Sequence, residues 1–275
     1  MSNGWAVITG ASSGLGAHFA RRLAERGLPL VLTGRHGERL DAAAAEVRAA
    51  TGATVETVVA DLATADGVDS LLAHLDGRDV EVLVNNAGFG TYGRFGEVPA
   101  RREATLIAVD VAALVALTHG VLPGMVARGR GKILNVASTI AFQPAPHQAV
   151  YGAAKAFVLS FSHALAAETR GTGVTVTALC PGPTRTGFVA ALESDVSGVA
   201  IYSRLAEPGP VVDAGLRAMD RGRPVVVPGL RNRLLAVSGR FVPTTVLTRI
   251  TGHLLASGRP SPGMAGASRR ASTNR

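Results

Sequence analysis

Short apolar runs alternate with longer stretches of helical periodicity along most of this chain, and that alternation constrains its fold more than any other feature. Between the runs, apolar residues recur at spacings of three and four, which predicts amphipathic helices. Strands separated by helices form a mostly parallel sheet covered on both faces. We therefore predict an α/β, doubly wound domain. Its seven strands are expected at 5–9, 30–34, 54–60, 81–85, 131–137, 173–179 and 224–228.

Composition supports a folded domain without disulfides. Apolar residues make up 47% of the 275 residues and charged residues 17%, which is not the composition of a disordered chain. The single cysteine, Cys180, excludes an internal disulfide and a cysteine zinc site, and the seven histidines form no H-x3-H pair. We expect no metal. The amino terminus lacks a signal-peptide pattern, and no uncharged apolar run reaches the roughly 18 residues of a membrane span, so we expect a cytoplasmic protein.

Charge divides the chain into unequal parts. The eight residues Arg231, Arg233, Arg240, Arg249, Arg259, Arg269, Arg270 and Arg275 follow Leu230, and no Asp or Glu does. The overall charge of +8 therefore belongs to this end, and residues 1–229 are neutral. We predict a catalytic domain at 1–229, a basic helical extension at 230–256 and a disordered tail at 257–275. A neutral body argues against nucleic acid as a partner.

A glycine-rich segment, Thr9-Gly10-Ala11-Ser12-Ser13-Gly14-Leu15-Gly16, follows the first strand and opens a helix. Glycines permit a tight turn and close backbone approach, and a helix amino terminus attracts a pyrophosphate. The hydroxyls of Ser12 and Ser13 add phosphate donors. Alone, the pattern also fits an ordinary strand–helix turn; in this context it predicts a Rossmann-type dinucleotide site.

The second strand ends in Leu32-Thr33-Gly34-Arg35, without the acidic residue that accepts the ribose 2′-OH of NAD. Arg35 offers a fork of donors suited to the 2′-phosphate of NADP. The plainer interpretation is a solvated arginine at a helix start. After the third strand, Asp61 could accept a hydrogen bond from an adenine amino group or cap a helix.

Ser138 follows the fifth strand, and Tyr151 and Lys155 lie four residues apart on one face of the next helix. The pKa of a phenol is about 10, and it must fall by roughly three units before the phenol can act as a base near neutrality. One positive charge at about 4 Å stabilises the phenolate by about 4 kcal/mol at an effective dielectric of 20. That stabilisation is large enough to account for such a fall in pKa. By itself a Tyr-x3-Lys also occurs by chance.

Together these residues resemble the short-chain dehydrogenase/reductase family. The resemblance covers residues 1 to about 190 and rests on order and spacing. Its motifs are Thr9-Gly10-x3-Gly14-x-Gly16, Asp61-Leu62, Asn85-Asn86-Ala87-Gly88, Ser138, Tyr151-x3-Lys155 and Pro181-Gly182.

The resemblance implies NADP(H)-dependent hydride transfer between an alcohol and a carbonyl, with Tyr151 as general acid/base beside Ser138. It implies further that Lys155 contacts the nicotinamide ribose, and that Arg35 lies where NADP-preferring members carry a basic residue. The remaining cofactor-binding positions it implies are Gly10, Ser12, Ser13, Gly14, Leu15, Gly16, Asp61, Leu62, Asn86, Ala87, Gly88, Pro181, Gly182 and Thr184.

One position departs from the family. Members usually carry Asn-Val at the centre of the fourth helix, where that Asn supports a water relay to the lysine, whereas this chain has Asp110-Val111. A carboxylate can still hold a water, but its charge would partly cancel the effect of Lys155 on Tyr151. We therefore include Asp110 among the catalytic residues and expect it to affect efficiency.

We predict an NADP(H)-dependent oxidoreductase that interconverts a small apolar carbonyl compound and its alcohol, and that forms a homodimer or homotetramer. Residues 185–207 are expected to form a substrate lid. Its apolar residues either line the substrate site or pack in the core, namely Phe188, Val189, Leu192, Val199, Ile201, Tyr202 and Leu205. The alternatives are an NADP(H)-binding sensor with weak turnover, and a membrane-surface reductase of lipid-like substrates.

Beyond the last strand, the spacing of apolar residues across 230–256 predicts two short amphipathic helices interrupted at Pro243. Their arginines could face anionic lipid. We favour the plainer interpretation, in which the apolar faces cover the substrate cleft or a subunit interface.

Overall fold

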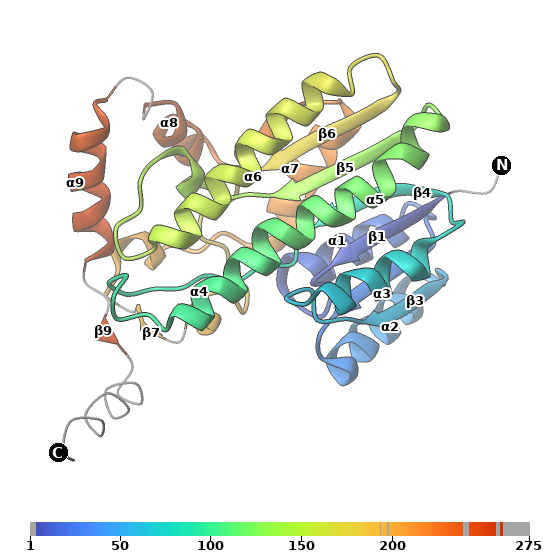
Figure 1. Cartoon of the computed structure of the whole chain (residues 1–275), viewed down its shortest axis with the longest axis horizontal. Coiled ribbons are helices and arrows are strands. Elements are labelled where there is room, and N and C mark those ends of the chain that lie inside the picture. The colour runs from blue at the N-terminus through green and yellow to red at the C-terminus, as the bar shows by residue number, and fades with distance from the viewer. Residues whose placement is uncertain (1–3, 193, 197, 239–241, 257–258, 261–275) are drawn as a thin grey trace.

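The computed structural model describes residues 4–192, 194–196, 198–238, 242–256 and 259–260. Its centre is one seven-stranded sheet in the order β3-β2-β1-β4-β5-β6-β8, with every neighbouring pair parallel (Figure 1). The strands are β1 Trp5–Thr9, β2 Leu30–Gly34, β3 Val55–Val59, β4 Val80–Asn85, β5 Gly131–Val136, β6 Val174–Leu179 and β8 Val225–Val226.

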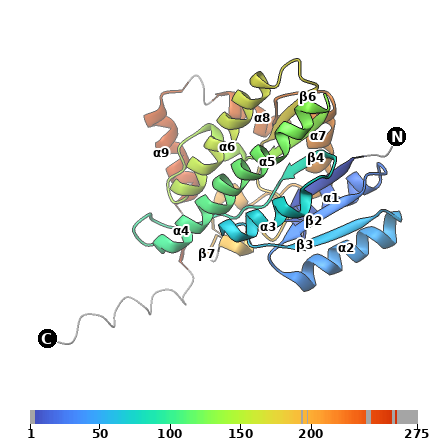
Figure 2. The same cartoon turned by 45° about the vertical axis from the view of Figure 1, so that its right-hand side comes forward.

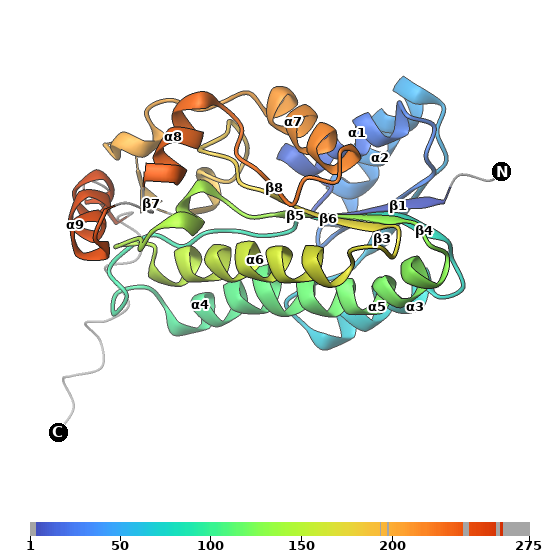
Figure 3. The same ribbon diagram turned by 90° about the horizontal axis from the view of Figure 1, so that it is seen from above.

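Helices cover both faces of this sheet. Figure 3 shows α1, α2 and α7 on one face and α3, α4, α5 and α6 on the other. The bounds are α1 Gly14–Ala24, α2 Gly37–Thr51, α3 Ala65–Leu75, α4 Ala100–Ile107, α5 Leu114–Ala127, α6 Ala149–Glu168 and α7 Pro208–Asp220. The predicted doubly wound fold is confirmed, because strand order reverses between β1 and β4.

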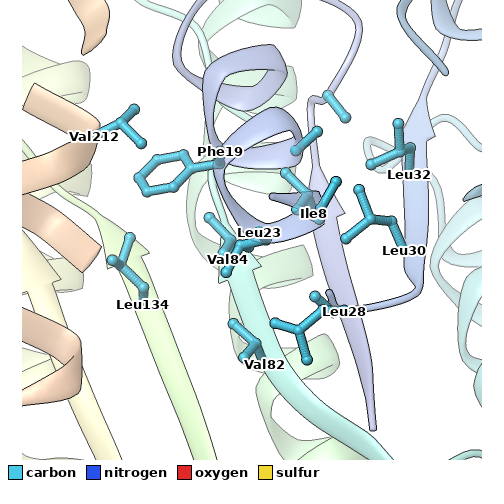
Figure 4. Close-up of a cluster of buried hydrophobic side chains, with 14 of the residues drawn as sticks. Ile8, Phe19, Leu23, Leu28, Leu30, Leu32, Val82, Val84, Leu134 and Val212 are labelled. Atoms are coloured by element: carbon cyan, nitrogen blue, oxygen red, sulfur yellow. The ribbon is translucent and has the colours of Figure 1, made fainter. Parts of the chain in front are cut away.

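The core forms where α1 packs on the sheet. Phe19 and Leu23 are buried on the inner face of α1 and point toward Ile8, Val84 and neighbouring strands (Figure 4). Their spacing of four residues puts both on one helical face, while the arginines of α1 lie outside. This packing fixes the start of α1 relative to the end of β1.

The seven strands are confirmed with ends shifted by one or two residues. A second, two-stranded sheet was not predicted: β7 (Ser194–Asp195) pairs antiparallel with β9 (Arg259–Pro260). These segments are two residues long, too short to show a periodicity. Three short helical turns, also unpredicted, complete the fold: η2 Thr139–Phe142, η3 Ala190–Leu192 and η4 Ala200–Tyr202.

One long helical rod runs from α4 to α5 through a π-helical turn, η1 (Ala108–Ala113). This rod, Ala100–Ala127, and the helix Ala149–Glu168 are each long and apolar enough to cross a membrane, a test that core helices also pass. Both lie against the sheet (Figure 3), where an apolar composition serves packing.

Two helices occupy the extension, α8 (Leu230–Ser238) and α9 (Thr244–Leu255), with Pro243 immediately before α9. Figures 1 and 2 place α9 at the end of the molecule remote from the amino terminus. On α9, Leu255 is buried against the main body. Within the predicted disordered tail, residues 259–260 form β9 instead, because they pair with β7; residues 257–258 and 261–275 lie outside the described part.

Phe19 provides a test of the core. Because its ring is fully buried, Phe19→Ala should lower the free energy of unfolding by about 3–5 kcal/mol in denaturant titrations. The control is Phe95→Ala, whose ring is 69% exposed, with an expected change within about 0.5 kcal/mol. Equal losses in the two variants would contradict this packing.

Candidate functional site

The glycine-rich turn lies between the end of β1 and the start of α1. Gly10 and Gly14 have φ of 64° and 56°, a backbone conformation that favours glycine. A Cβ on Gly16 would lie 2.2 Å from the Gly10 carbonyl oxygen, so α1 can approach β1 this closely only with glycine there. The sequence therefore needs glycine at all three positions for structural reasons.

Asn86 ties this turn to the end of β4. Its Nδ2 donates to the carbonyl oxygens of Thr9 and Gly10 at 2.9 and 3.2 Å. In return, Thr9 Oγ1 accepts the backbone N–H groups of Asn86 and Ala87, both at 2.9 Å. These four bonds hold the two loops at the switch point in one arrangement.

The amino terminus of α1 is suited to an anion. Ser13 precedes the helix without a side-chain cap, and the first turn contains no acidic residue. Its backbone N–H groups and the positive end of the helix dipole therefore face the cavity described below. The residues present thus fit a pyrophosphate.

A basic cluster follows β2 at the adjacent part of the cavity. Arg35, His36 and Arg39 all line it, and Arg35 Nε donates to His36 Nε2 at 3.1 Å. Arg35 and Arg39 are exposed, so their guanidinium groups can reach a ligand from solvent. Asp61 and Leu62 also line the cavity, after β3, the strand that pairs with β2. Only Arg35 was singled out from the sequence, because His36 and Arg39 belong to no motif.

At the carboxyl end of β5, Ser138 meets Tyr151 of α6. The Ser138 hydroxyl acts to lower the pKa of Tyr151, and Ser138 Oγ accepts the Ile140 N–H at 3.3 Å. Lys155 Nζ lies 5.7 Å from the centre of the Tyr151 ring and donates to the Val136 carbonyl oxygen at 3.0 Å. The three predicted catalytic side chains therefore meet in one place.

Asp110 lies against Lys155. Its Oδ2 is 2.9 Å from Lys155 Nζ, and both side chains are buried, with exposed fractions of 0% and 7%. Asp110 Oδ1 accepts the Phe89 N–H at 3.1 Å. Gly88 makes room for this carboxylate, since a Cβ there would lie 2.9 Å from Oδ2. The π-helical turn carries Asp110, and such turns are frequent at functional sites.

This ion pair changes the electrostatics expected from the sequence. Burial raises the pKa of Tyr151 above its ordinary value, the charge of Asp110 raises it further, and the hydrogen bond with Ser138 opposes both. Burial likewise raises the pKa of Asp110, against the opposing effects of Lys155 and the Phe89 N–H. The low pKa that Lys155 alone would give Tyr151 is therefore opposed by burial first and by Asp110 second, and the second effect has the direction expected from the Asp110 charge.

These parts surround one cavity of about 370 Å³. Nearly every site residue named from the sequence lines it. The exceptions are Gly16, buried under the turn, and Asp110, which acts behind Lys155. The lining residues from the predicted set are Gly10, Ser12, Ser13, Gly14, Leu15, Arg35, Asp61, Leu62, Asn86, Ala87, Gly88, Ser138, Tyr151, Lys155, Pro181, Gly182 and Thr184.

Some apolar residues of the segment 185–207 line the cavity, and others pack in the core, the two roles that the sequence left open. Phe188, Val189, Ile201 and Tyr202 line the cavity, and the Phe188 and Tyr151 ring centres are 5.3 Å apart. Leu192 and Val199, by contrast, are buried in the core, at 2% and 1% exposure.

Gln148 was missed from the sequence. Its side chain is buried, accepts the Tyr202 hydroxyl at 3.1 Å and donates to the Thr91 carbonyl oxygen at 3.2 Å. Burial raises the pKa of Tyr202, and the nearby Tyr151 raises it further. No local motif marks Gln148, because its partners are distant in the sequence. Among the described residues, no cluster of His, Cys, Asp or Glu could hold a metal ion.

Comparison with known proteins agrees with this geometry. The family model described as short chain dehydrogenase matches residues 4–197. A very-long-chain 3-oxoacyl-CoA reductase of Anas platyrhynchos is 37% identical over 182 residues, 64% of this chain and 58% of that protein. An NADP-dependent 3-hydroxy acid dehydrogenase of Salmonella typhimurium is 39% identical over 183 residues, 64% of this chain and 71% of that protein. For the first of these relatives, the matched part is less than two thirds of its length.

Solved structures cover more of the chain. A short-chain dehydrogenase from Sphingobium yanoikuyae in complex with NADPH superposes with a TM-score of 0.79 at 36% identity, covering 86% of this chain and 93% of that one. A bulky-bulky ketone specific alcohol dehydrogenase from Comamonas testosteroni gives a TM-score of 0.75 at 30% identity, covering 88% and 94%.

Proposed function

Because the chain belongs to the short-chain dehydrogenase family, we propose that it is an NADP(H)-dependent oxidoreductase that interconverts an apolar ketone or aldehyde with its alcohol. One observation carries the proposal: Ser138, Tyr151 and Lys155 line the same cavity as the glycine-rich turn and Arg35. A nucleotide and a carbonyl compound bound there would therefore meet at the Tyr151 hydroxyl. The NADPH complex of the Sphingobium yanoikuyae relative supports the choice of cofactor.

The chain offers separate positions for the two ends of the cofactor. The uncapped start of α1 suits the pyrophosphate. Arg35, with His36 and Arg39 beside it, suits a 2′-phosphate. The end of β2 carries no acidic residue, which would repel that phosphate. Lys155 and the segment Pro181–Thr184 line the same cavity, and we propose that they hold the nicotinamide half. When bound, NADPH supplies the hydride that reduces the carbonyl carbon.

The hydroxyls of Ser138 and Tyr151 would hold the carbonyl oxygen, and Tyr151 would donate its proton to that oxygen. Burial and Asp110 raise the pKa of Tyr151, so its phenol is protonated at neutral pH. A protonated phenol is the form needed for reduction. We therefore propose carbonyl reduction as the favoured direction near neutrality, and alcohol oxidation at more alkaline pH.

The substrate pocket combines an apolar wall with one polar contact. Phe188, Val189 and Ile201 provide the wall, and the Tyr202 hydroxyl, bound to Gln148, provides the polar group. This lining suits an apolar carbonyl compound. A second candidate function is an NADP(H) sensor with weak turnover, which the engagement of Lys155 by Asp110 favours. One measurement distinguishes the two functions, namely NADPH oxidation with a panel of apolar ketones and aldehydes. The oxidoreductase should oxidise NADPH with members of this panel, and the sensor should do so only weakly.

Tyr151→Phe tests the chemistry. The variant should bind NADPH nearly as the unaltered protein does but reduce carbonyls about 10² to 10⁴ times more slowly, because it lacks the transferred proton. NADPH fluorescence titration and steady-state rates measure the two effects. Tyr92→Phe is the control, since the Tyr92 hydroxyl bonds to the Leu255 carbonyl oxygen away from the cavity. More than half the activity remaining in Tyr151→Phe would show that the phenol is not the proton donor.

Arg35→Ala tests cofactor choice. Hydrogen bonds to charged groups contribute about 1.5–3 kcal/mol, so the variant should bind NADPH about 10- to 150-fold more weakly while its NADH affinity stays the same. Arg170→Ala, on an exposed residue remote from the cavity, should change neither affinity. Equal affinities of the unaltered protein for NADPH and NADH would refute the assignment.

Asp110→Asn tests the electrostatics. Alcohol oxidation requires the phenolate, and removing a negative charge that raises the pKa of Tyr151 should shift the optimum to lower pH. The shift should be on the order of one pH unit. Profiles of rate against pH for the variant, the unaltered protein and the exposed control Asp76→Asn measure it. Superimposable profiles for Asp110→Asn and the unaltered protein would mean that Asp110 does not set the ionisation of Tyr151.

A further inference from the structure

The extension leaves large apolar side chains uncovered. On α8, Leu230 and Leu234 are 73% and 62% exposed, so these side chains do not cover the substrate cleft, one of the two roles that the sequence predicted for them. Helix α8 buries the small Ala236 instead. We call the exposed set the C-terminal apolar face: Leu230, Leu234, Leu235, Val246, Ile250 and Leu254.

On α9 the apolar face forms a regular stripe. Val246, Ile250 and Leu254 follow one another at intervals of four, which places them on one side of the helix. Thr251 and Leu255 are buried on the other side, where Thr251 Oγ1 donates to the Pro144 carbonyl oxygen. The helix is therefore anchored to the domain on one side and apolar on the other.

The two helices that carry this face also carry exposed arginines. Arg231 and Arg233 on α8 and Arg249 on α9 are exposed. The sequence from 230 onward contains eight arginines and no Asp or Glu. An occupant of the face must therefore offer apolar contact together with negative charge.

A second copy of the chain does not meet this requirement, because a symmetric interface would bring the same basic surface together with itself. Nucleic acid offers the charge but little to cover the leucines. An anionic lipid surface offers both, since apolar side chains enter the acyl boundary while arginines remain at the headgroups. We propose that α8 and α9 dock the protein on anionic membranes through the C-terminal apolar face.

The helices that carry this face pack, through their other sides, on the walls of the substrate pocket. Helix α9 packs on η4, which carries Ile201 and Tyr202, and α8 packs on η2. The Tyr92 hydroxyl donates to the Leu255 carbonyl oxygen. This hydrogen bond links the end of α9 to the loop that contains Tyr92. The same loop contains Phe95, whose ring is 69% exposed. If the proposed function holds, on which this step rests, docking would place the apolar pocket beside the lipid phase that supplies its substrate.

The experiment is sedimentation of the full-length protein with vesicles. The protein should sediment with vesicles of phosphatidylglycerol and phosphatidylcholine in equal parts and remain in solution with phosphatidylcholine alone, and high salt should weaken the binding. Ile250→Ser should reduce vesicle affinity about tenfold through lost apolar burial. Val59→Ser is the matched control, because Val59 is 56% exposed on the far edge strand β3. Absence of sedimentation at physiological salt, or equal losses in the two variants, would overturn the proposal.

Charge variants separate docking from folding. Arg249→Gln should lower the affinity for the anionic vesicles about fivefold, the effect expected for one basic side chain at such a surface. Arg170→Gln, at the opposite end of α6, should leave it unchanged. Reduction of a water-soluble ketone without vesicles should be the same in all four variants. An unaltered protein that reduces the ketone but does not sediment with the anionic vesicles would refute the docking alone. An unaltered protein that docks but oxidises no NADPH would refute the proposed function.

Discussion

The junction between the carboxyl ends of β1 and β4 is the constraint on which the rest of the site depends. Four hydrogen bonds cross it, from Asn86 Nδ2 to the carbonyl oxygens of Thr9 and Gly10 and from the N–H groups of Asn86 and Ala87 to Thr9 Oγ1. Gly16 lets α1 lie directly over the turn. With these loops fixed, the start of α1 and the loop after β4 face the same cavity, and parallel strands bring Ser138 to the same edge.

A second interaction gives the site its chemical character. The buried pair of Asp110 and Lys155 lies behind Tyr151 and is supported by the Val136 carbonyl and the Phe89 N–H. Because neither charge is exposed, solvent screens the pair only weakly. The positive charge of Lys155 is therefore offset at the phenol by the negative charge of Asp110. Together with burial, Asp110 raises the pKa of Tyr151, which connects one unusual side chain in the sequence to the direction of the proposed reaction.

The sequence predicted the parts that depend on local patterns. Strands and helices were found from periodicity, and the cavity residues from motifs with fixed spacing. It named Asp110 as a charge that opposes Lys155, but it could not predict their direct ion pair, the bond between Gln148 and Tyr202, or the exposed side of α8, because each depends on contacts between distant segments. The same reason explains β7 and β9, whose pairing joins positions 194–195 to 259–260.

The central claim is that Tyr151 is a neutral phenol at physiological pH. The chain has three tyrosines, so a protein labelled with ¹³C at the tyrosine ζ carbon gives three signals, and Tyr151→Phe identifies the one of interest. The account predicts that this signal keeps the chemical shift of a protonated phenol beyond the ordinary tyrosine pKa of about 10. Titration of the signal near neutrality would show that the phenol is already ionised there and would contradict the account.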